Sequence, residues 1–308
     1  MPDSSSAAAR NKPIADIRAA LREAIAQLER RHLPAAAKDA ELLLMCALGR
    51  DRAWIYAHPE QELDAATRER YFSMIARRAG GAPVQHLTGQ QEFWGLDFEV
   101  TPDVLIPRPE TEHVIEVALE RLGAGPAAGS PRRTEELRIM DMGTGSGCIA
   151  IALAGEMPAS RIVAIDISPA ALEVARRNAR RHGVASRIDF VKCNLMESLP
   201  ILPAHFDLIV SNPPYIGRWE AATLASEVRE HEPESALFGG NKGTELYAPL
   251  IAQAALLLKF GGLLVLEIGH ASSEHVLGLL AAPAWADVAV TNDLAGIPRV
   301  ISARRGPR

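Results

Sequence analysis

Apolar side chains recur at helical spacing through the first part of the chain. The first stripe contains Ile14, Ile17, Leu21, Ile25 and Leu28. A period of three to four residues places such side chains on one face of a helix. Pro34 suits the first turn of a second helix that ends at Gly49, and Asp64 suits the N-cap of a third that stops at Gly80. Residues 1–81 therefore predict a tail followed by a small helical domain.

Between residues 82 and 106 the pattern becomes that of paired strands. The segment Glu92–Val100 is rich in aromatic residues, alternates in part and is interrupted by Gly95. Such a segment is typical of two strands joined by a turn, and Pro107 ends the extended stretch. We therefore predict a β-hairpin linker over residues 82–106 and a further domain over residues 107–308.

Short apolar runs alternate with helical segments after Leu137. The expected strands are Arg138–Met142, Arg161–Asp166, Ile188–Val191, Phe206–Ser211, Leu263–Ile268, Val288–Thr291 and Arg299–Ala303. Alternation of strand and helix predicts an α/β fold with a mostly parallel sheet that helices cover on both faces. In such sheets ligands bind at the carboxyl ends of the strands, so the candidate site residues are expected there.

Composition and charge narrow the classes of protein that fit. The formal net charge of −5 argues against binding nucleic acid mainly through its phosphates. No apolar run approaches the length of a membrane span, and Met1–Ala9 lacks a signal segment, so a cytoplasmic protein is expected. The cysteines and histidines show no metal-ligand spacing, so no metal site is expected.

A glycine-rich turn follows the first strand of the α/β part, from Asp141 to Gly147. Gly143, Gly145 and Gly147 allow a tight turn and a close approach of a ligand to the backbone, with Thr144 and Ser146 between them. Asp166 ends the next strand, where a carboxylate can accept both ribose hydroxyls of an adenosine cofactor. A dinucleotide fold usually has GxGxxG, whereas this turn has GxGxG. Asp141 would repel a pyrophosphate but suits a methionine amino group, which favours S-adenosylmethionine over a dinucleotide.

The segment Asn212-Pro213-Pro214-Tyr215 follows the apolar strand that ends at Ser211. Two prolines turn the chain out of the sheet and remove backbone donors. The Asn212 side-chain oxygen and the Pro213 carbonyl can each accept one hydrogen of an NH₂ group, and Tyr215 offers a flat face. Acceptors placed in this way favour charge developing on a planar nitrogen as it is methylated. Asn212, Pro213 and Tyr215 are therefore the candidate catalytic residues.

With these motifs the chain resembles the HemK/PrmC release factor glutamine methyltransferases, a family of class I methyltransferases. The matching segments are Leu87–Gly89, Glu92–Gly95, Leu105–Glu112, Asp141–Gly147, Asn212–Tyr215, Glu232-Pro233 with Ala236-Leu237, and Asp293–Gly296 with Arg299-Val300. Pro107–Glu112 also separates this family from its sister family, which methylates a glutamine of a ribosomal protein. The resemblance implies a Rossmann-like domain with a seven-stranded sheet, preceded by a helical domain that helps to hold the substrate.

The resemblance also implies the substrate and further site residues. The substrate would be the glutamine of the Gly-Gly-Gln loop of class 1 peptide chain release factors, methylated on N5, with S-adenosyl-L-homocysteine as the other product and no direct need for nucleic acid. The chain is expected to be a monomer. Cofactor contacts would include Asn194, Leu195 and Asn212, and Pro214, Phe93 and Arg108 would join the substrate site. Many relatives have an acidic residue where this chain has Asn194, which removes a charge from the adenine contact.

Three alternatives remain open from the sequence. The same Asn-Pro-Pro-Tyr segment also serves enzymes that methylate exocyclic amines of nucleic-acid bases. The net charge of −5 and the absence of a recognisable target-recognition domain weigh against such an enzyme. A glutamine of a ribosomal protein is a second possible acceptor. A non-catalytic cofactor-binding scaffold is the third alternative, and the combination of Asp166 with Asn212 weighs against it.

Overall fold

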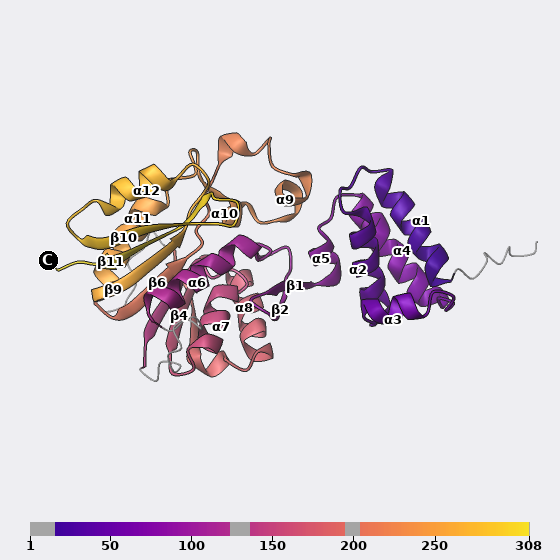
Figure 1. Ribbon diagram of the computed structural model, residues 1–308, viewed down its shortest axis with the longest axis horizontal. Coiled ribbons are helices and arrows are strands. Elements are labelled where there is room, and N and C mark those ends of the chain that lie inside the picture. Colours follow the sequence, from indigo (N-terminus) through magenta and orange to yellow (C-terminus); the bar gives the residue numbers. More distant parts are fainter. Residues whose placement is uncertain (1–15, 124–135, 195–203, 308) are drawn as a thin grey trace, which may run out of the picture. The chain divides into compact units, whose positions relative to one another are not determined.

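The computed structural model describes residues 16–123, 136–194 and 204–307. The chain divides into two compact units, Met1–Thr88 and Gly89–Arg308 (Figure 1). Leu195, one of the expected cofactor residues, lies outside the described residues.

The first unit is helical, as the apolar stripes predict. Its helices are α1 (Ile17–Glu29), α2 (Ala36–Leu48), α3 (Arg52–Ala57), α4 (Ala65–Ala79) and α5 (Val84–Thr88). The Asp64 side chain caps α4 by accepting a hydrogen bond from the Thr67 amide, and Gly49 ends α2 in the left-handed conformation. Leu28, Leu43 and Ile75 are fully buried in a core formed within this unit.

Two short helices of the first unit are absent from the sequence prediction. Helix α3 begins at an N-cap, Asp51, whose side chain accepts from the Trp54 amide. Helix α5 forms where the linker was expected to begin, and the carbonyl of Pro83 accepts from the His86 and Leu87 amides. Both helices are too short for apolar periodicity to reveal them.

The second unit opens with the expected β-hairpin. Strands β1 (Gln90–Phe93) and β2 (Leu96–Glu99) pair antiparallel, with Phe93 opposite Leu96. Trp94 and Gly95 form the turn with positive φ angles of 55° and 69°. Two consecutive positive φ angles belong to a turn whose twist suits a hairpin, which explains the glycine that interrupts the alternation.

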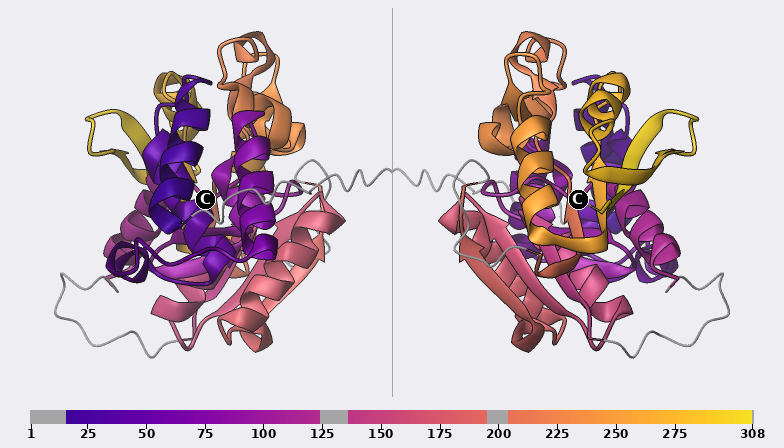
Figure 2. Two further views of the ribbon diagram at one scale, coloured as in Figure 1. Left: turned by 90° about the vertical axis from the view of Figure 1, so that its right-hand side faces the viewer. Right: turned by 90° about the vertical axis from the view of Figure 1, so that its left-hand side faces the viewer.

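A seven-stranded sheet forms the centre of the second unit, in the order β10-β11-β9-β6-β3-β4-β5. The strands are β3 (Arg138–Met142), β4 (Arg161–Asp166), β5 (Ile188–Lys192), β6 (Phe206–Ser211), β9 (Leu258–Glu267), β10 (Trp285–Asn292) and β11 (Pro298–Arg305). The pairs among β3, β4, β5, β6 and β9 are parallel, and β11 is antiparallel to both of its neighbours. The hairpin of β10 and β11 (yellow) lies at one edge, and β5 lies at the other (Figure 2). The predicted mostly parallel sheet is confirmed.

Helices cover both faces of this sheet, because its central strands are apolar on both sides. The helices are α6 (Glu112–Arg121), α7 (Cys148–Glu156), α8 (Pro169–Arg181), α11 (Tyr247–Leu257) and α12 (Ser273–Leu280). In β3 the neighbouring residues Ile139 and Met140 belong to two different cores. Ile139 packs in the core that contains α6 and α7, and Met140 packs in the core that contains α11 and α12.

An excursion between β6 and α11 carries further short elements that the sequence did not predict. They are β7 (Ile216–Gly217), η4 (Arg218–Glu220), α9 (Ser226–His231), α10 (Glu234–Leu237) and β8 (Phe238–Gly240). Strands β7 and β8 pair in parallel. The 3₁₀ turn η1 (Pro109–Thr111) precedes α6, and η3 (Ala185–Arg187) precedes β5. The excursion follows Asn212–Tyr215 directly, so its packing decides where that segment lies.

Candidate active site

A cavity of about 230 Å³ lies at the carboxyl ends of β3, β4 and β6, where the parallel sheet predicts a ligand site. The sequence-predicted residues that line it are Arg108, Gly143, Thr144, Gly145, Ser146, Asp166, Asn194, Asn212 and Pro214. Residues from five separate parts of the chain therefore meet around one space. Asp141, Gly147, Pro213, Tyr215 and Phe93 are not among its lining residues.

The glycine turn adopts a conformation that its sequence requires. Gly143, Gly145 and Gly147 have φ angles of 77°, 54° and 84°, which other residues rarely adopt. The Gly143 and Thr144 amides both donate to the Ile165 carbonyl at 2.9 Å, which ties the turn to β4. A Cβ on Gly147 would lie 3.1 Å from the Cβ of Ala175 in α8, so Gly147 serves packing rather than the cavity wall.

Asp166 holds the other side of this turn. Its Oδ2 accepts from the Gly145 amide at 2.9 Å, and its Oδ1 accepts from the Ser168 amide at 2.9 Å. Burial raises the pKa of this carboxyl above its ordinary value. Each carboxylate oxygen can accept a second hydrogen bond, and the side chain lines the cavity. Asp166 is thus placed to accept hydroxyl groups of a bound ligand.

Asp141 lies behind the cavity wall rather than in it. Its side chain is fully buried, and its Oδ2 accepts from the hydroxyl of Thr144 at 2.6 Å. Burial raises the pKa of Asp141 to about 7. Within the described ranges, its Oδ1 has no hydrogen-bond partner. Asp166 thus offers acceptors for ligand hydroxyls in the cavity, and the unpartnered carboxylate oxygen of Asp141 behind the wall favours a cationic group nearby.

Asn212 and Tyr215 are both held by hydrogen bonds to other segments. Asn212 Nδ2 donates to the hydroxyl of Thr111 at 3.0 Å, and the Tyr215 hydroxyl donates to Glu267 Oε1 at 3.1 Å. Burial, and next the neighbouring Glu267 charge, raise the pKa of Tyr215 above its ordinary value. Tyr215 is therefore a neutral phenol at physiological pH. The sequence identified Asn212 and Tyr215 but neither of their partners.

Two glycines that the sequence analysis did not single out pack against the backbone of this segment. A Cβ on Gly239 would overlap the carbonyl oxygen of Pro214, and a Cβ on Gly243 would overlap that of Tyr215. Gly243 also has a positive φ of 84°. Only glycine permits such a close approach of two backbones. Gly239-Gly240 and Gly243 are visible in the sequence as a glycine cluster, which was the available signal.

Arg108 lines the cavity with its charge already paired. Its guanidinium forms an ion pair with Glu232, whose side chain is 1% exposed. The other carboxylate oxygen of Glu232 accepts from the Ile106 amide at 3.2 Å. Glu232 therefore holds the segment Ile106–Arg108 at the cavity. The position of Glu232 in the sequence did not reveal this role.

Phe93 lies elsewhere than the sequence interpretation expected. It is 1% exposed, packs edge-to-face on Phe98, and belongs to the core shared with α6 and α7. An aromatic residue on the inward face of a hairpin strand buries its whole ring, which leaves no surface for a substrate. We therefore leave Phe93 out of the proposed substrate site.

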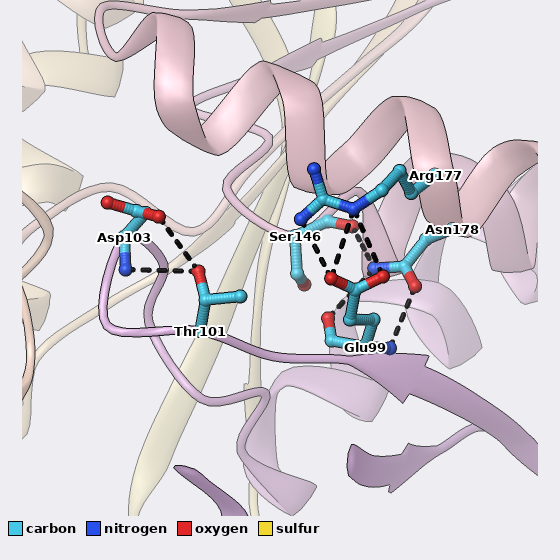
Figure 3. A network of polar contacts seen from close by, with 6 residues as sticks. All are labelled: Glu99, Thr101, Asp103, Ser146, Arg177 and Asn178. Carbon is cyan, nitrogen blue, oxygen red and sulfur yellow. Dashed lines mark hydrogen bonds and ion pairs between the residues drawn. The ribbon is translucent and has the colours of Figure 1, made fainter. Parts of the chain in front are cut away.

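A polar network fastens the hairpin to the glycine turn (Figure 3). Asn178 of α8 is fully buried, accepts from the Glu99 amide at 2.8 Å, and donates to the Glu99 carbonyl at 3.0 Å and to the Ser146 carbonyl at 2.9 Å. Arg177 forms an ion pair with the Glu99 side chain. The side-chain amide of Asn178 thus holds β2 and the glycine turn together. The sequence analysis did not identify Asn178, because a single asparagine within a helix belongs to no recognisable motif or spacing.

The described segments contain neither a membrane-spanning helix nor a metal-binding cluster of side chains. No helix there has the length and apolar character needed to cross a membrane. In the same residues no group of at least three His, Cys, Asp or Glu side chains is arranged to hold a metal ion.

The fold and the cavity define the class of protein, and comparisons with known proteins agree. The family model described as a methyltransferase domain matches residues 133–276. The catalytic domain of hMettl16, solved in complex with MAT2A 3'UTR hairpin 6, matches with a TM-score of 0.55 and 17% identity. That match covers 76% of this chain and 84% of the solved chain, and at this identity it shows the fold alone. The chain is a class I methyltransferase by fold.

The particular family follows from closer relatives. The PrmC N-terminal domain model matches residues 19–89. The release factor glutamine methyltransferase of Koribacter versatilis is 42% identical over 290 residues, which cover 94% of this chain and 98% of the relative. The protein of the same name from Bradyrhizobium diazoefficiens is 43% identical over 292 residues, covering 94% and 95%. The chain belongs to the release factor glutamine methyltransferase family.

Proposed function

We propose that this protein transfers a methyl group from S-adenosyl-L-methionine to N5 of the glutamine in the Gly-Gly-Gln loop of class 1 peptide chain release factors. The observation that carries the proposal is the position of Asn212. Its side chain lines a cavity whose other wall is the glycine turn, at the carboxyl ends of adjacent strands. Family membership supports a glutamine of a release factor as the acceptor.

The residues around the cavity suit this cofactor. Asp166 would accept the ribose hydroxyls, and Gly143–Gly147 would lie along the methionine part of the cofactor. Asp141 would stabilise the amino group by its charge, and Asn194 would hydrogen-bond the adenine amino group through its oxygen. When bound, the cofactor supplies an electrophilic methyl group on a sulfonium sulfur. The product is S-adenosyl-L-homocysteine, and no metal is needed for the transfer.

The substrate amide would be held by acceptors rather than deprotonated by a base before transfer, and the methylated nitrogen would then lose one proton to water. The Asn212 side-chain oxygen and the Pro213 carbonyl accept the two hydrogens of the glutamine NH₂ group. Because the amide lone pair is delocalised, acceptors aimed at its hydrogens favour the charge that develops on nitrogen during transfer. Tyr215 holds the chain at this point, and its raised pKa excludes it as a base at neutral pH. The transfer thus depends on positioning.

The helical part of the chain, which we assign to residues 1–81 with a hairpin linker over 82–106, would position the release factor. A monomer acting in the cytoplasm, with no membrane contact and no direct need for nucleic acid, suits such a substrate. Arg108, paired with Glu232, and Pro214 would form the rim that the substrate loop passes.

Methyl transfer to a purified release factor tests the proposal. Incubation with methyl-labelled S-adenosylmethionine should label the release factor and leave a variant with the loop glutamine replaced unlabelled. Asn212→Ala should lower kcat at least about 100-fold, because a preorganised acceptor is lost, while the cofactor Kd changes little. Equal labelling of the wild-type release factor and of its loop-glutamine variant would contradict the proposal. Preferred labelling of a ribosomal protein or of DNA, tested in parallel, would also contradict it.

A further inference from the structure

An exposed tryptophan lies on the excursion that follows the Asn212–Tyr215 segment. Trp219 of η4 is 73% exposed, which makes it the most exposed aromatic residue in the part of the chain that the structure describes. A single apolar side chain on the surface of a protein is common and has no meaning by itself. The packing of this indole and its position relative to the cavity distinguish Trp219 from the other exposed apolar residues.

The turn that carries Trp219 is held by local contacts. The Gly217 amide donates to Glu220 Oε1 at 2.9 Å, which closes η4 around Trp219. A Cβ on Gly217 would lie 2.6 Å from the indole nitrogen of Trp219, so one edge of the ring packs on the Gly217 backbone. The indole is thus held in place although most of it faces solvent. A surface that is fixed before binding loses little conformational entropy on association.

The same excursion also forms part of the cavity wall. Arg218, next to Trp219, pairs with Glu234 at 3.3 Å. Glu234 directly precedes Ser235 and Ala236, and both of these residues line the cavity. The turn that carries Trp219 is therefore joined to the cavity wall by a side-chain contact as well as by the chain itself.

The length of the chain limits how far Trp219 can lie from the cavity. Trp219 follows Pro214, which lines the cavity, by five residues. Five fully extended residues span at most about 18 Å, and the 3₁₀ turn η4 shortens that span. A protein partner of ordinary size covers about 800 Å² of the surface, which is a circle with a radius of about 16 Å. A protein that delivers a side chain into the cavity is therefore expected to contact Trp219.

The charge of the excursion indicates the character of such a partner. Residues 216–240 contain five glutamates and two arginines, a net charge of −3. The face of an indole attracts cationic side chains, and carboxylates around it favour the same partner. Lysine and arginine side chains therefore fit this surface better than acidic side chains do.

We propose that Trp219 is a docking residue that binds a basic segment of the release factor beside its Gly-Gly-Gln loop. The inference rests on the proposed function, which makes a release factor the protein that delivers a glutamine into the cavity. Trp219 contacts this partner outside the cavity and takes no part in the methyl transfer. It therefore strengthens the binding of the release factor, as buried tryptophans commonly do in protein interfaces, without changing the rate of the transfer itself.

Substitution of Trp219 should separate binding from methyl transfer. Trp219→Ala should raise the KM for the release factor about 10-fold to 30-fold, the size expected when an aromatic residue is removed from an interface. Its kcat at saturating release factor and its Kd for the cofactor should stay within about 3-fold of the wild type, because a lost docking contact acts on KM alone. Trp219→Phe keeps an aromatic ring and should recover most of the affinity. Since the indole lies outside the core, Trp219→Ala should melt at the wild-type temperature.

Phe260→Ala provides the matched control. Phe260 is 61% exposed, and the Arg305 guanidinium lies over its ring at 5.7 Å. It belongs to the amino-terminal part of β9, whereas the cavity lies at the carboxyl ends of the parallel strands. Removing this exposed ring should leave KM, kcat and the cofactor Kd within about 3-fold of the wild type.

Two charged substitutions test the character of the partner. Against a basic segment, Trp219→Lys adds a repulsion and Trp219→Glu adds an attraction. The KM for the release factor should therefore be at least about 3-fold higher in Trp219→Lys than in Trp219→Glu. Equal KM values in these two variants would overturn the assignment of a basic partner.

A second readout measures binding without methyl transfer. Titration of each variant with the release factor, in the presence of S-adenosyl-L-homocysteine, should give a Kd about 10-fold to 30-fold higher in Trp219→Ala than in the wild type. An unchanged Kd in Trp219→Ala would overturn the inference. A wild-type protein that binds the release factor without methylating it would contradict the proposed function alone, and the Kd values would still decide the role of Trp219. A wild-type protein that does not bind the release factor would overturn both proposals.

Discussion

Glu267 and Asp141 are two buried carboxyl groups near the carboxyl ends of β9 and β3. Burial raises the pKa of each to about 7, and the hydroxyls of Thr111 and Thr144 partly oppose that rise. Each group lies beside a residue of the proposed site, Glu267 beside Tyr215 and Asp141 beside Thr144. Burying these carboxyl groups costs free energy and perturbs their pKa values, and functional sites often contain carboxyl groups perturbed in this way.

The raised pKa of Glu267 predicts how stability depends on pH. Because the folded protein binds this proton more tightly than the unfolded chain does, the free energy of unfolding should fall as the pH rises from about 4.5 to about 7. Glu267→Gln should remove about 3 kcal/mol of that fall and leave the share that Asp141 contributes. Chemical denaturation across this pH range measures it.

An exposed carboxyl provides the comparison for Glu267. Glu274 lies on the surface of α12, so Glu274→Gln makes the same substitution without touching the buried carboxyls and serves as the matched control. If Glu267→Gln has the same pH dependence as the wild type, Glu267 does not carry a raised pKa in the folded protein.

At the scale of elements, the hairpin β1–β2 and helix α8 are joined by a single buried amide. Asn178→Ala would leave the Glu99 amide, the Glu99 carbonyl and the Ser146 carbonyl without their partner (Figure 3). Unsatisfied buried groups are costly, so we expect a loss of about 3 kcal/mol in the free energy of unfolding and weaker cofactor binding. Urea denaturation and calorimetry measure the two effects.

The neighbouring Arg177 gives a control for Asn178. Its side chain is 41% exposed and that of its partner Glu99 is 35% exposed. Solvent screens such a pair, so Arg177→Ala should cost less than about 1 kcal/mol. Equal losses in Asn178→Ala and Arg177→Ala would show that the buried amide is not what fastens the hairpin.

Elements differ in how far the sequence predicted them. Strands Arg138–Met142, Arg161–Asp166 and Phe206–Ser211 have the predicted bounds, because buried parallel strands are short apolar runs with polar or glycine neighbours. Strand β9 begins at Leu258, earlier than the expected Leu263, since Lys259–Gly262 breaks the apolar run. Short elements such as α9 and β7 were not predicted, because contacts distant in sequence stabilise them.

The whole molecule consists of two units, each with its own hydrophobic core. We therefore expect residues 89–308 alone to bind S-adenosylmethionine with a Kd close to that of the full chain. Transfer to an intact release factor should fall at least about 10-fold in kcat/KM, a loss of about 1.4 kcal/mol, if the helical unit positions the substrate. Calorimetry and methyl incorporation test the two statements separately.

Two results would contradict this expectation. An unchanged kcat/KM in the shortened chain would remove the proposed role of the helical unit. Failure of residues 89–308 to bind the cofactor, with a normal melting transition, would place part of the cofactor site in the first unit.

The sequence by itself determined the α/β architecture, the glycine turn and the Asn212–Tyr215 segment. These depend on local rules: apolar period, glycine conformation and the position of prolines at strand ends. The tertiary structure alone decided which side chains reach the cavity and which partners they have. It placed Phe93 in the core, Asp141 behind Thr144, and Thr111 against Asn212. A hydrogen bond between residues far apart in sequence depends on how whole elements pack, and no local pattern records that.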